Sequence, residues 1–390
     1  MDYDKESLAT HESLKGKIGI ANKMELKTRD DLSIAYTPGV AEPCRVIAAE
    51  PAAARRLTIK GNSIAVVSDG SAVLGLGNIG GLASLPVMEG KAMLFKEYAD
   101  IDAWPIVLDT QDPDEIIRTV RLIAPGFGGI NLEDIAAPQC FRIEEELQDL
   151  GIPVFHDDQH GTAIVLLAAL INAAKLVGKE ITDLRVVING AGAAGTAIAR
   201  LIRCIGHEES ACVSVAEVLV CDSKGIVHPG RDDLNSEKQE LLDYTNRHDR
   251  GGDLRDALTD ADVFIGVSKG NLLTGEDIKL MAPDPIIFAM ANPVPEIMPD
   301  IARAAGAAIV GTGRSDFPNQ VNNVLAFPGI FRGALDVGAE RITSAMKLAA
   351  ARALADATSD PSPDAVLPSA LDTTVAAKIA AATAAAYQTS

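Results

Sequence analysis

Two pairs of adjacent carboxylates are the residues of this sequence with the clearest chemical potential. Glu133 and Asp134 lie in the segment Asn-Leu-Glu-Asp-Ile, and Asp157 and Asp158 lie in Phe-His-Asp-Asp-Gln-His. Each pair follows an apolar segment, so each can stand at the carboxyl end of a strand, where open α/β sheets gather ligands. Carboxylate oxygens suit Mg²⁺ or Mn²⁺, and neither pair has the spacing of a zinc motif. The pairs predict a Mg²⁺ or Mn²⁺ site, against the alternative of two solvated acidic turns.

A lysine and a tyrosine are candidates for proton transfer. Lys91 lies in the apolar segment Pro-Val-Met-Glu-Gly-Lys-Ala-Met-Leu-Phe, where a lysine ordinarily extends its ammonium to solvent. To act as a base near neutral pH, its pKa must fall by about 3 from about 10.4, which burial and a nearby divalent cation can supply. Tyr36 lies in the turn-rich segment Ala-Tyr-Thr-Pro-Gly and is not distinctive by itself. We interpret His156 and His160 as hydrogen-bonding turn residues and not as metal ligands.

Two segments match the pattern Gly-x-Gly-x-x-Gly of dinucleotide-binding loops. The second match follows directly on a predicted strand over 185–189 and precedes a predicted helix over 196–202. In that setting the glycines allow a tight turn, and backbone N–H groups reach a pyrophosphate at a helix N-terminus. The first match, residues 75–80, lies several residues beyond its strand and is interpreted as a loop packed against a helix. The residues expected to contact the dinucleotide are Gly190, Gly192, Ala193, Ala194 and Gly195.

An acid at the end of the next predicted strand is placed to bind the ribose of the dinucleotide. Asp222 follows the apolar residues 218–221, thirty-two positions after Gly190, whereas about 20 is usual. The loop over residues 206–210 is therefore expected to be extended. An acid there favours NAD because it repels the 2′-phosphate of NADP, but Lys224 can offset this repulsion. The choice between NAD and NADP stays open.

These residues require an α/β framework to position them. In the N-terminal part we expect a helix within the first thirty residues, a helix over 142–150 that ends at Gly151, and a buried helix over 162–177. From residue 184 onward, predicted strands alternate with helical segments, as in a doubly wound parallel sheet. The expected strands are residues 63–68, 106–108, 153–155, 185–188, 218–221, 263–267, 286–290 and 307–310.

The sequence predicts two α/β domains. Residues 1–160 would form a substrate domain, and residues 161–330 would form a Rossmann-type, doubly wound dinucleotide-binding domain. Residues 331–390 are Ala-rich and predict C-terminal helices, separated by a proline-bearing loop, that pack back on the first domain.

Composition limits the classes of partner. The chain has 390 residues, with 35 Lys and Arg against 54 Asp and Glu, which gives a formal net charge of −19. This charge argues against nucleic-acid binding and against an anionic membrane surface. The longest apolar stretch, residues 163–174, is too short to span a bilayer. Five cysteines without a Cys-x-x-Cys pair, and no secretion signal, predict reduced thiols in a soluble cytoplasmic protein.

Taken together, eight segments resemble the malic enzymes, specifically the short bacterial type, and they occur in that family's order. The matching segments are Tyr36–Val40, Ser68–Gly80, Pro86–Lys91, Asn131–Asp134, His156–Thr162, Asn189–Gly195, Ala291–Pro293 and Gln320–Gly329. The resemblance implies oxidative decarboxylation of L-malate to pyruvate and CO₂ with NAD or NADP and with Mg²⁺ or Mn²⁺. It also implies decarboxylation of oxaloacetate and a homodimer or higher homo-oligomer, in which active sites can be shared.

The resemblance assigns roles to particular residues. Lys91 would be the base that takes the proton of the C2 hydroxyl, Tyr36 would be the acid that protonates C3, and Asp157 would orient Lys91. Glu133, Asp134 and Asp158 would hold the metal, Asn292 and Asn323 would bind malate, and Asn292 would also contact the cofactor.

One departure concerns the malate carboxylate. Larger malic enzymes carry an arginine where this chain has Ser71 and Ala72. The candidates to replace it are Ser71, backbone N–H groups of the loop over 75–80, or an arginine from elsewhere. Two alternative functions stay open, a malolactic enzyme that retains its cofactor and a catalytically silent nucleotide-binding protein.

Overall fold

The computed structural model describes residues 2–206 and 212–388, and the first of its two sheets has four parallel strands. The strand order is β2-β1-β3-β4. The strands are β1 (Ser63–Ser68), β2 (Asp102–Val107), β3 (Gly129–Leu132) and β4 (Val154–His156), and the helices between them are α5 (Gly81–Ala99), α6 (Pro113–Ile123) and α7 (Gln139–Glu146). The middle strands β1 and β3 are buried on both faces, as parallel sheets require.

The second sheet has six strands in the order β10-β9-β8-β5-β6-β7. Five strands are parallel and β7 is antiparallel to β6. They are β5 (Arg185–Asn189), β6 (Glu217–Asp222), β7 (Gly225–Ile226), β8 (Val263–Gly266), β9 (Ile286–Ala289) and β10 (Ile309–Thr312). The helices along this part are α9 (Ala193–Ile202), α10 (Ser236–Leu241), α11 (Leu254–Leu258), α12 (Gly275–Ile278) and α13 (Pro299–Ala304). After β5 the chain proceeds first to β6 on one side and later to β8 on the other, so ligands are expected where β5 and β8 end.

These sheets confirm the predicted two-domain α/β fold and, within a few residues, all eight predicted strands. The helices differ more. The predicted helix over 142–150 is α7, which ends at Glu146, and turns then lead to Gly151 with φ +66°. Of residues 2–30, only Tyr3–Leu14 and the first two residues of the helix Arg29–Ala35 are helical. Of the loop expected to be extended over 206–210, only Gly206 lies within the described residues.

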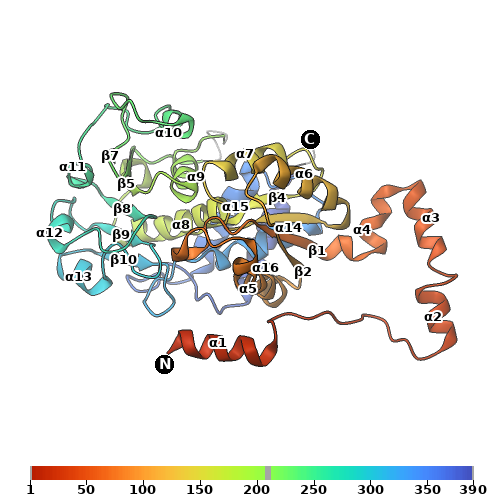
Figure 1. Cartoon of the computed structure of the whole chain (residues 1–390). Helices are drawn as coiled ribbons and strands as arrows, with labels where there is room; N and C mark the ends of the chain where they lie inside the picture. Colours follow the sequence, from red (N-terminus) through yellow and green to blue (C-terminus); the bar gives the residue numbers. More distant parts are fainter. Residues whose placement is uncertain (1, 207–211, 389–390) are drawn as a thin grey trace.

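A long apolar helix, α8 (Asp157–Leu176), passes through the middle of the molecule (Figure 1). It begins five residues earlier than predicted because Asp157 and Asp158 occupy its first turn, where carboxylates complement the helix dipole. Its length and composition resemble those of a membrane-spanning helix, but most of its residues are buried within the protein. Even Asn172 is satisfied there, since its side-chain amide donates to the carbonyl oxygens of Ala355 and Val366, each at 2.9 Å. We therefore interpret α8 as a core helix.

Three C-terminal helices complete the core, α14 (Phe327–Asp336), α15 (Ser344–Ala357) and α16 (Thr374–Ala385). Phe95 of α5 meets Phe327 and Phe331 of α14 edge-on, with ring centroids 4.6 and 5.4 Å apart. Edge-on aromatic pairs stabilise by about 1 kcal/mol beyond their buried area. The C-terminal part of the chain therefore packs against a helix of the first sheet.

The N-terminal segment stands away from this core (Figure 1). Its helices α1 (Tyr3–Leu14), α2 (Arg29–Ala35) and α3 (Ala41–Ala49) have no buried residue. Side chains such as Leu8, Ile34 and Tyr36 are more than 60% exposed. An exposed series of large apolar side chains of this kind is unusual for a monomer and is typical of an interaction surface.

The prediction of reduced thiols is wrong for one pair, because the structure contains a disulfide between Cys204 and Cys212. Cys204 has φ +61°, and this left-handed residue turns the chain after α9. The spacing of two cysteines cannot reveal such a turn. Cys44, Cys140 and Cys221 are free. Burial raises the pKa of the Cys140 and Cys221 thiols to about 12, so both are unreactive at neutral pH.

Candidate active site

The side chain of Lys91 does not extend to solvent. It is 7% exposed on α5, and its ammonium lies 4.3 Å from the ring centroid of Phe327. Its Nζ donates to Oδ2 of Asp157 at 2.7 Å and lies 2.8 Å from Oε1 of Glu133. An unpaired charge would not persist in this buried position, so the two buried carboxylates stabilise the ammonium and hold it in place.

The charges around Lys91 govern its pKa. Burial by itself lowers the pKa of Lys91, as predicted, but the carboxylates of Asp157, Glu133 and Asp158 outweigh burial and raise the pKa above its usual range. Burial in turn raises the pKa of each of these three carboxyls despite the attraction of Lys91. Two buried acids, Asp157 and Glu133, and the half-buried Asp158 therefore face a single ammonium, and a further cation would relieve their mutual repulsion.

The two acidic pairs meet as the sequence predicted. Glu133 and Asp134 follow β3, while Asp157 and Asp158 follow the neighbouring strand β4. Glu133, Asp134 and Asp158 each direct a carboxylate oxygen to one region, where the three oxygens lie within 4.8 Å of one another. Asp134 has φ +53°, and its backbone N–H donates to Oδ2 of Asp158 at 2.8 Å. Three converging hard oxygen donors match the preference of Mg²⁺ or Mn²⁺.

Asp157 is the other partner of Lys91, and a glycine gives its carboxylate room. A Cβ built on Gly161, one helical turn along α8, would lie 1.8 Å from Oδ1 of Asp157 and 3.2 Å from Cβ of Asn323. Asn323, at the start of the short helix Asn323–Leu325, therefore lies near the Asp157 carboxylate. The motif His-Asp-Asp-Gln-His-Gly thus requires glycine at its last position.

The variant Gly161→Ala is expected to lower kcat by about 100-fold, because a displacement of a catalytic group by about 1 Å has this effect. The added methyl group forces the Asp157 carboxylate away from Lys91. The measurement is steady-state kinetics together with thermal unfolding. Gly126→Ala is the matched control, since a Cβ at Gly126 meets no atom within 4 Å. A Gly161→Ala protein with normal kcat would contradict the importance of this contact.

The prediction that His156 and His160 are turn residues is wrong, because His156 ends β4 and His160 lies in α8, but hydrogen bonding of the ring is confirmed for His160. Lys347 of α15 donates to Nδ1 of His160 at 3.1 Å, so Nε2 carries the ring proton and donates to Glu144 at 3.0 Å. Glu144 also accepts the backbone N–H of His156 at 3.1 Å, which holds the residue before Asp157. Sequence reasoning missed Glu144 and Lys347, because no local pattern connects α7, α8 and α15.

The hydroxyl of Ser71 connects two loops of the site. Its Oγ donates to Oδ1 of Asp69 at 2.6 Å and accepts the backbone N–H of Ala136 at 2.8 Å. The backbone N–H of Ala72 donates to the carbonyl oxygen of Asp134 at 3.0 Å. Ser71 therefore holds the turn that carries Asp134, and its proton is already engaged by Asp69.

Two predicted residues are placed differently from the rest. Asn292 follows β9 and is exposed at the surface of the dinucleotide-binding half. Tyr36 lies at the end of α2 in the projecting N-terminal segment and is 68% exposed (Figure 1). The fold of one chain brings Lys91, Glu133, Asp134, Asp157, Asp158 and Asn323 together, and it leaves Tyr36 apart.

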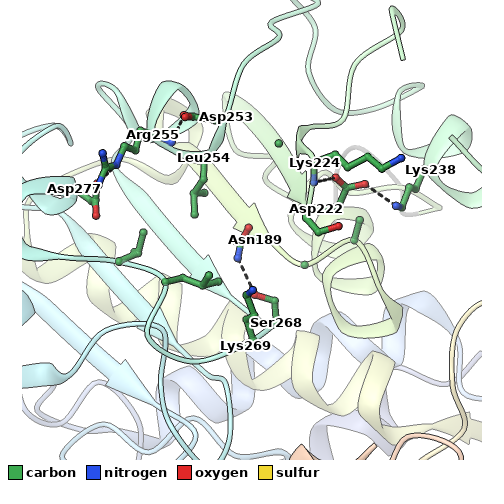
Figure 2. Close-up of a pocket in the computed structure, with 16 residues that line it drawn as sticks. Asn189, Asp222, Lys224, Lys238, Asp253, Leu254, Arg255, Ser268, Lys269 and Asp277 are labelled. Carbon is green, nitrogen blue, oxygen red and sulfur yellow. Dashed lines mark hydrogen bonds and ion pairs between the residues drawn. The ribbon is translucent and has the colours of Figure 1, made fainter. Parts of the chain in front are cut away.

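The dinucleotide-binding loop has the expected geometry. Gly190 has φ +130°, and a Cβ at Gly195 would lie 1.8 Å from the carbonyl oxygen of Gly190, so both positions require glycine. The helix α9 begins at Ala193, within the motif, and its free N–H groups are available to a phosphate. The loop borders a pocket of about 940 Å³ at the carboxyl ends of β5, β6 and β8 (Figure 2). This volume is ample for a nucleotide.

Asp222 lines this pocket beside Lys238 (Figure 2), and its carboxylate is held by two cationic side chains. Arg231 donates to both carboxylate oxygens of Asp222 at 2.9 Å, and Nζ of Lys238 donates to Oδ2 at 2.6 Å. Burial alone would raise the pKa of Asp222, but these hydrogen bonds lower it to about 2. Lys224, the cation noted from the sequence, pairs with Asp233 instead at 2.8 Å. Only the tertiary structure reveals Arg231 and Lys238 as the partners of this acid.

The fold and the site define a dinucleotide-dependent oxidoreductase with a cluster of three carboxylates beside a buried lysine. Residues 15–148 match the family model "Malic enzyme, N-terminal domain", and residues 159–388 match "Malic enzyme, NAD binding domain". A bifunctional malic/malolactic enzyme of Bacillus subtilis is 55% identical over 98% of this chain and 93% of its own length. An NADP-dependent malic enzyme of Haemophilus influenzae is 52% identical over 87% of this chain and 44% of its own length.

A solved structure extends these comparisons. The crystal structure of the NAD-dependent malic enzyme of Thermotoga maritima has a TM-score of 0.92 and 50% sequence identity, and it covers 97% of this chain and 98% of that chain. The chain therefore belongs to the malic enzyme family, and its reaction is the oxidative decarboxylation of malate with NAD or NADP.

Proposed function

We propose that the buried Lys91, with its carboxylate partners, is the base of the oxidative decarboxylation of L-malate. The observation that carries the proposal is the position of Nζ, 2.7 Å from Asp157 and 2.8 Å from Glu133, next to three converging acids. Asp157 orients the lysine and has no freedom to rotate away, because it is fully buried. In its neutral amine form, Lys91 would take the proton of the C2 hydroxyl as malate is oxidised.

Glu133, Asp134 and Asp158 are proposed to hold Mg²⁺ or Mn²⁺. The convergence of their oxygens within 4.8 Å and the charge imbalance around Lys91 both support a divalent cation there. A bound divalent cation would supply Lewis-acid polarisation of the C2 oxygen during decarboxylation. Glu133 contacts Lys91 directly, so a ligand role for Glu133 also weakens the charge that raises the pKa of Lys91.

Asn323, Asn292 and Ser71 are proposed to position malate. Asn323 lies beside Asp157, where its amide can meet a substrate oxygen held near Lys91. Asn292 adds an exposed amide from the dinucleotide-binding half, where it can also meet the cofactor. Ser71 acts through the turn that carries Asp134, because its hydroxyl is engaged by Asp69.

Tyr36 is proposed to protonate C3 of the enolpyruvate from a neighbouring subunit. Tyr36 is exposed and belongs to a segment without buried residues, which supports a dimer in which this segment packs on a second chain. A shared active site would then require dimerisation for activity. We further propose a cytoplasmic enzyme whose substrate domain is residues 1–160, whose dinucleotide domain is residues 161–330, and whose helices over 331–390 return to the first domain.

The assay that tests the reaction follows absorbance at 340 nm with L-malate and Mn²⁺. Protein treated with a chelator is expected to form no NADH or NADPH, and added Mn²⁺ or Mg²⁺ is expected to restore the rate. The variant Asp158→Asn should weaken Mn²⁺ binding by about tenfold or more, because the site loses one of its charged ligands. Full activity of the chelated protein would contradict the metal proposal while leaving the family assignment intact.

Malolactic activity is a second candidate function, because one relative is named a bifunctional malic/malolactic enzyme. In that reaction the cofactor stays bound and lactate is the product. The same reaction mixture can be examined for lactate and pyruvate. Lactate without accumulation of NADH or NADPH would favour the malolactic function, whereas pyruvate matched by reduced cofactor would favour the malic function.

Lys238 is proposed to allow NADP as well as NAD, because it and Arg231 compensate the charge of Asp222. The variant Lys238→Gln is expected to lower kcat/KM with NADP by about 10- to 100-fold and to change the value for NAD little, since a hydrogen bond to a charged group contributes about 1.5–3 kcal/mol. Lys224→Gln is the matched control, because Lys224 pairs with Asp233. Equal losses with NAD and NADP would reject this role.

A further inference from the structure

A fully buried glutamate lies between the two ligand-binding loops of the second sheet. Glu296 is 0% exposed, and its carboxylate contacts two different loops. Its Oε1 accepts the backbone N–H of Ser268, in the loop after β8, at 3.2 Å. Its Oε2 accepts the backbone N–H of Ala291, in the loop after β9, at 3.1 Å. One carboxylate thus holds both loops at adjacent strand ends.

The surrounding backbone is shaped to admit this side chain. A Cβ built on Gly266, the last residue of β8, would lie 2.2 Å from Cδ of Glu296, so only glycine leaves room for the carboxylate. The carbonyl oxygen of Glu296 also accepts the backbone N–H groups of Leu272 and Leu273, each at 2.9 Å. Both ends of the residue are therefore tied to the loop after β8, which restricts its motion.

Each loop leads from Glu296 to a different ligand. The hydroxyl oxygen of Ser268 accepts a hydrogen bond from the side-chain amide of Asn189 at 2.8 Å, and Asn189 directly precedes Gly190 of the dinucleotide loop (Figure 2). Ala291 directly precedes Asn292. The contact between Asn189 and Ser268 joins the ends of β5 and β8, where the strand order reverses. A single buried carboxylate therefore connects the dinucleotide loop with the loop that carries Asn292.

We propose that Glu296 is a positioning residue that fixes the position of Asn292 relative to the dinucleotide loop, so that bound cofactor and bound malate are correctly oriented toward each other. Glu296 acts only through Ser268 and Ala291. The substrate half of this inference rests on the proposed role of Asn292 in binding malate. Loss of the Glu296 carboxylate should therefore weaken the binding of both the dinucleotide and malate. Loss of one connecting contact should weaken the binding of only one of them.

The test compares Glu296→Gln with Ser268→Ala in the full-length protein. A glutamine at 296 presents an NH₂ donor to one of the two N–H groups, so the dissociation constant of NADH or NADPH and the KM of malate are each expected to rise about tenfold. In Ser268→Ala the N–H of residue 268 remains but the acceptor for Asn189 is lost. Only the dinucleotide dissociation constant is then expected to rise, by about threefold. Glu276→Gln, an exposed glutamate of α12, is the matched control.

Four outcomes decide the proposal. Normal dinucleotide binding and normal malate KM in a folded Glu296→Gln protein overturn it. If Glu296→Gln does not fold, unchanged dinucleotide binding in Ser268→Ala overturns the cofactor half. Asn292→Ala separates this inference from the proposed function. A raised malate KM in Asn292→Ala with a normal one in Glu296→Gln rejects the positioning role alone, and a normal KM in Asn292→Ala rejects the role of Asn292 together with the substrate half.

Discussion

Lys91→Ala is expected to lower kcat for malate oxidation by about 1,000-fold, within the range that positioned acid–base groups contribute, and to change the KM of malate much less. The reason is that, in the proposed mechanism, Lys91 is the proton acceptor for the C2 hydroxyl, whereas the amides and the acidic cluster provide the binding contacts. The ammonium is the single cation within 2.8 Å of both Glu133 and Asp157 among the described residues. No neighbouring basic side chain can therefore take over this role.

The measurement for Lys91→Ala is the initial rate at 340 nm with saturating Mn²⁺, together with thermal unfolding. Unfolding must be followed because the variant leaves buried carboxylates without their partner, which destabilises proteins by about 3–5 kcal/mol. Lys96→Ala on the same helix is the control, since Lys96 pairs with Asp100 and Asp102 at the surface. A folded Lys91→Ala protein with normal turnover would remove Lys91 from its assigned role.

Mixed dimers of Tyr36→Phe and Lys91→Ala subunits are expected to regain activity that neither variant has alone. If Tyr36 acts in the site of a neighbouring subunit, each mixed dimer contains one site with both Lys91 and Tyr36. Random pairing then restores about a quarter of the wild-type rate, because about half of the dimers are mixed and one of their two sites is complete. If Tyr36 acted within its own chain, every site of the mixed dimer would lack one group.

The complementation experiment unfolds and refolds the two variants together, or expresses them together with different affinity tags, and measures kcat of the unfractionated mixture. The purified mixed dimers are expected to reach about half of the wild-type kcat, because one of their two sites is complete. Tyr3→Phe, which alters an exposed tyrosine of α1, is the matched control and should be active without being mixed with a second variant. Tyr36→Phe alone should slow pyruvate formation while leaving reduction of oxaloacetate less affected. Absence of activity in verified mixed dimers would reject the shared site.

Much of the framework could be predicted because it depends on local pattern. The buried strand over 63–68 and the strands of the second sheet are short apolar runs, which a parallel sheet requires on both faces. The backbone itself requires glycine at positions 190 and 195. Gly190 has φ +130°, and a Cβ at Gly195 would lie 1.8 Å from the carbonyl oxygen of Gly190. The acidic pairs stood directly after two such runs, so their convergence followed once β3 and β4 paired.

The partners of the charged groups could not be predicted, because they come from distant parts of the chain. Lys347 reaches His160 from α15, and Lys238 reaches Asp222 from α10, although the sequence had indicated Lys224. The sign of the pKa change at Lys91 also depends on these distances, since burial and three carboxylates act in opposite directions. A residue type states which charge is present, but only the fold decides how close the opposing charges lie.

The sequence by itself determined the class of fold and, through motifs that resemble those of the malic enzymes, the family and its reaction. These follow from periodicity and from short motifs, in which each residue is constrained by its immediate neighbours. The tertiary structure decided which of those residues form one site. It joins Lys91 to Glu133 and Asp157, places Glu296 between two loops, and leaves Tyr36 exposed on a projecting segment. The physical reason is that such contacts depend on long-range packing, which no local pattern encodes.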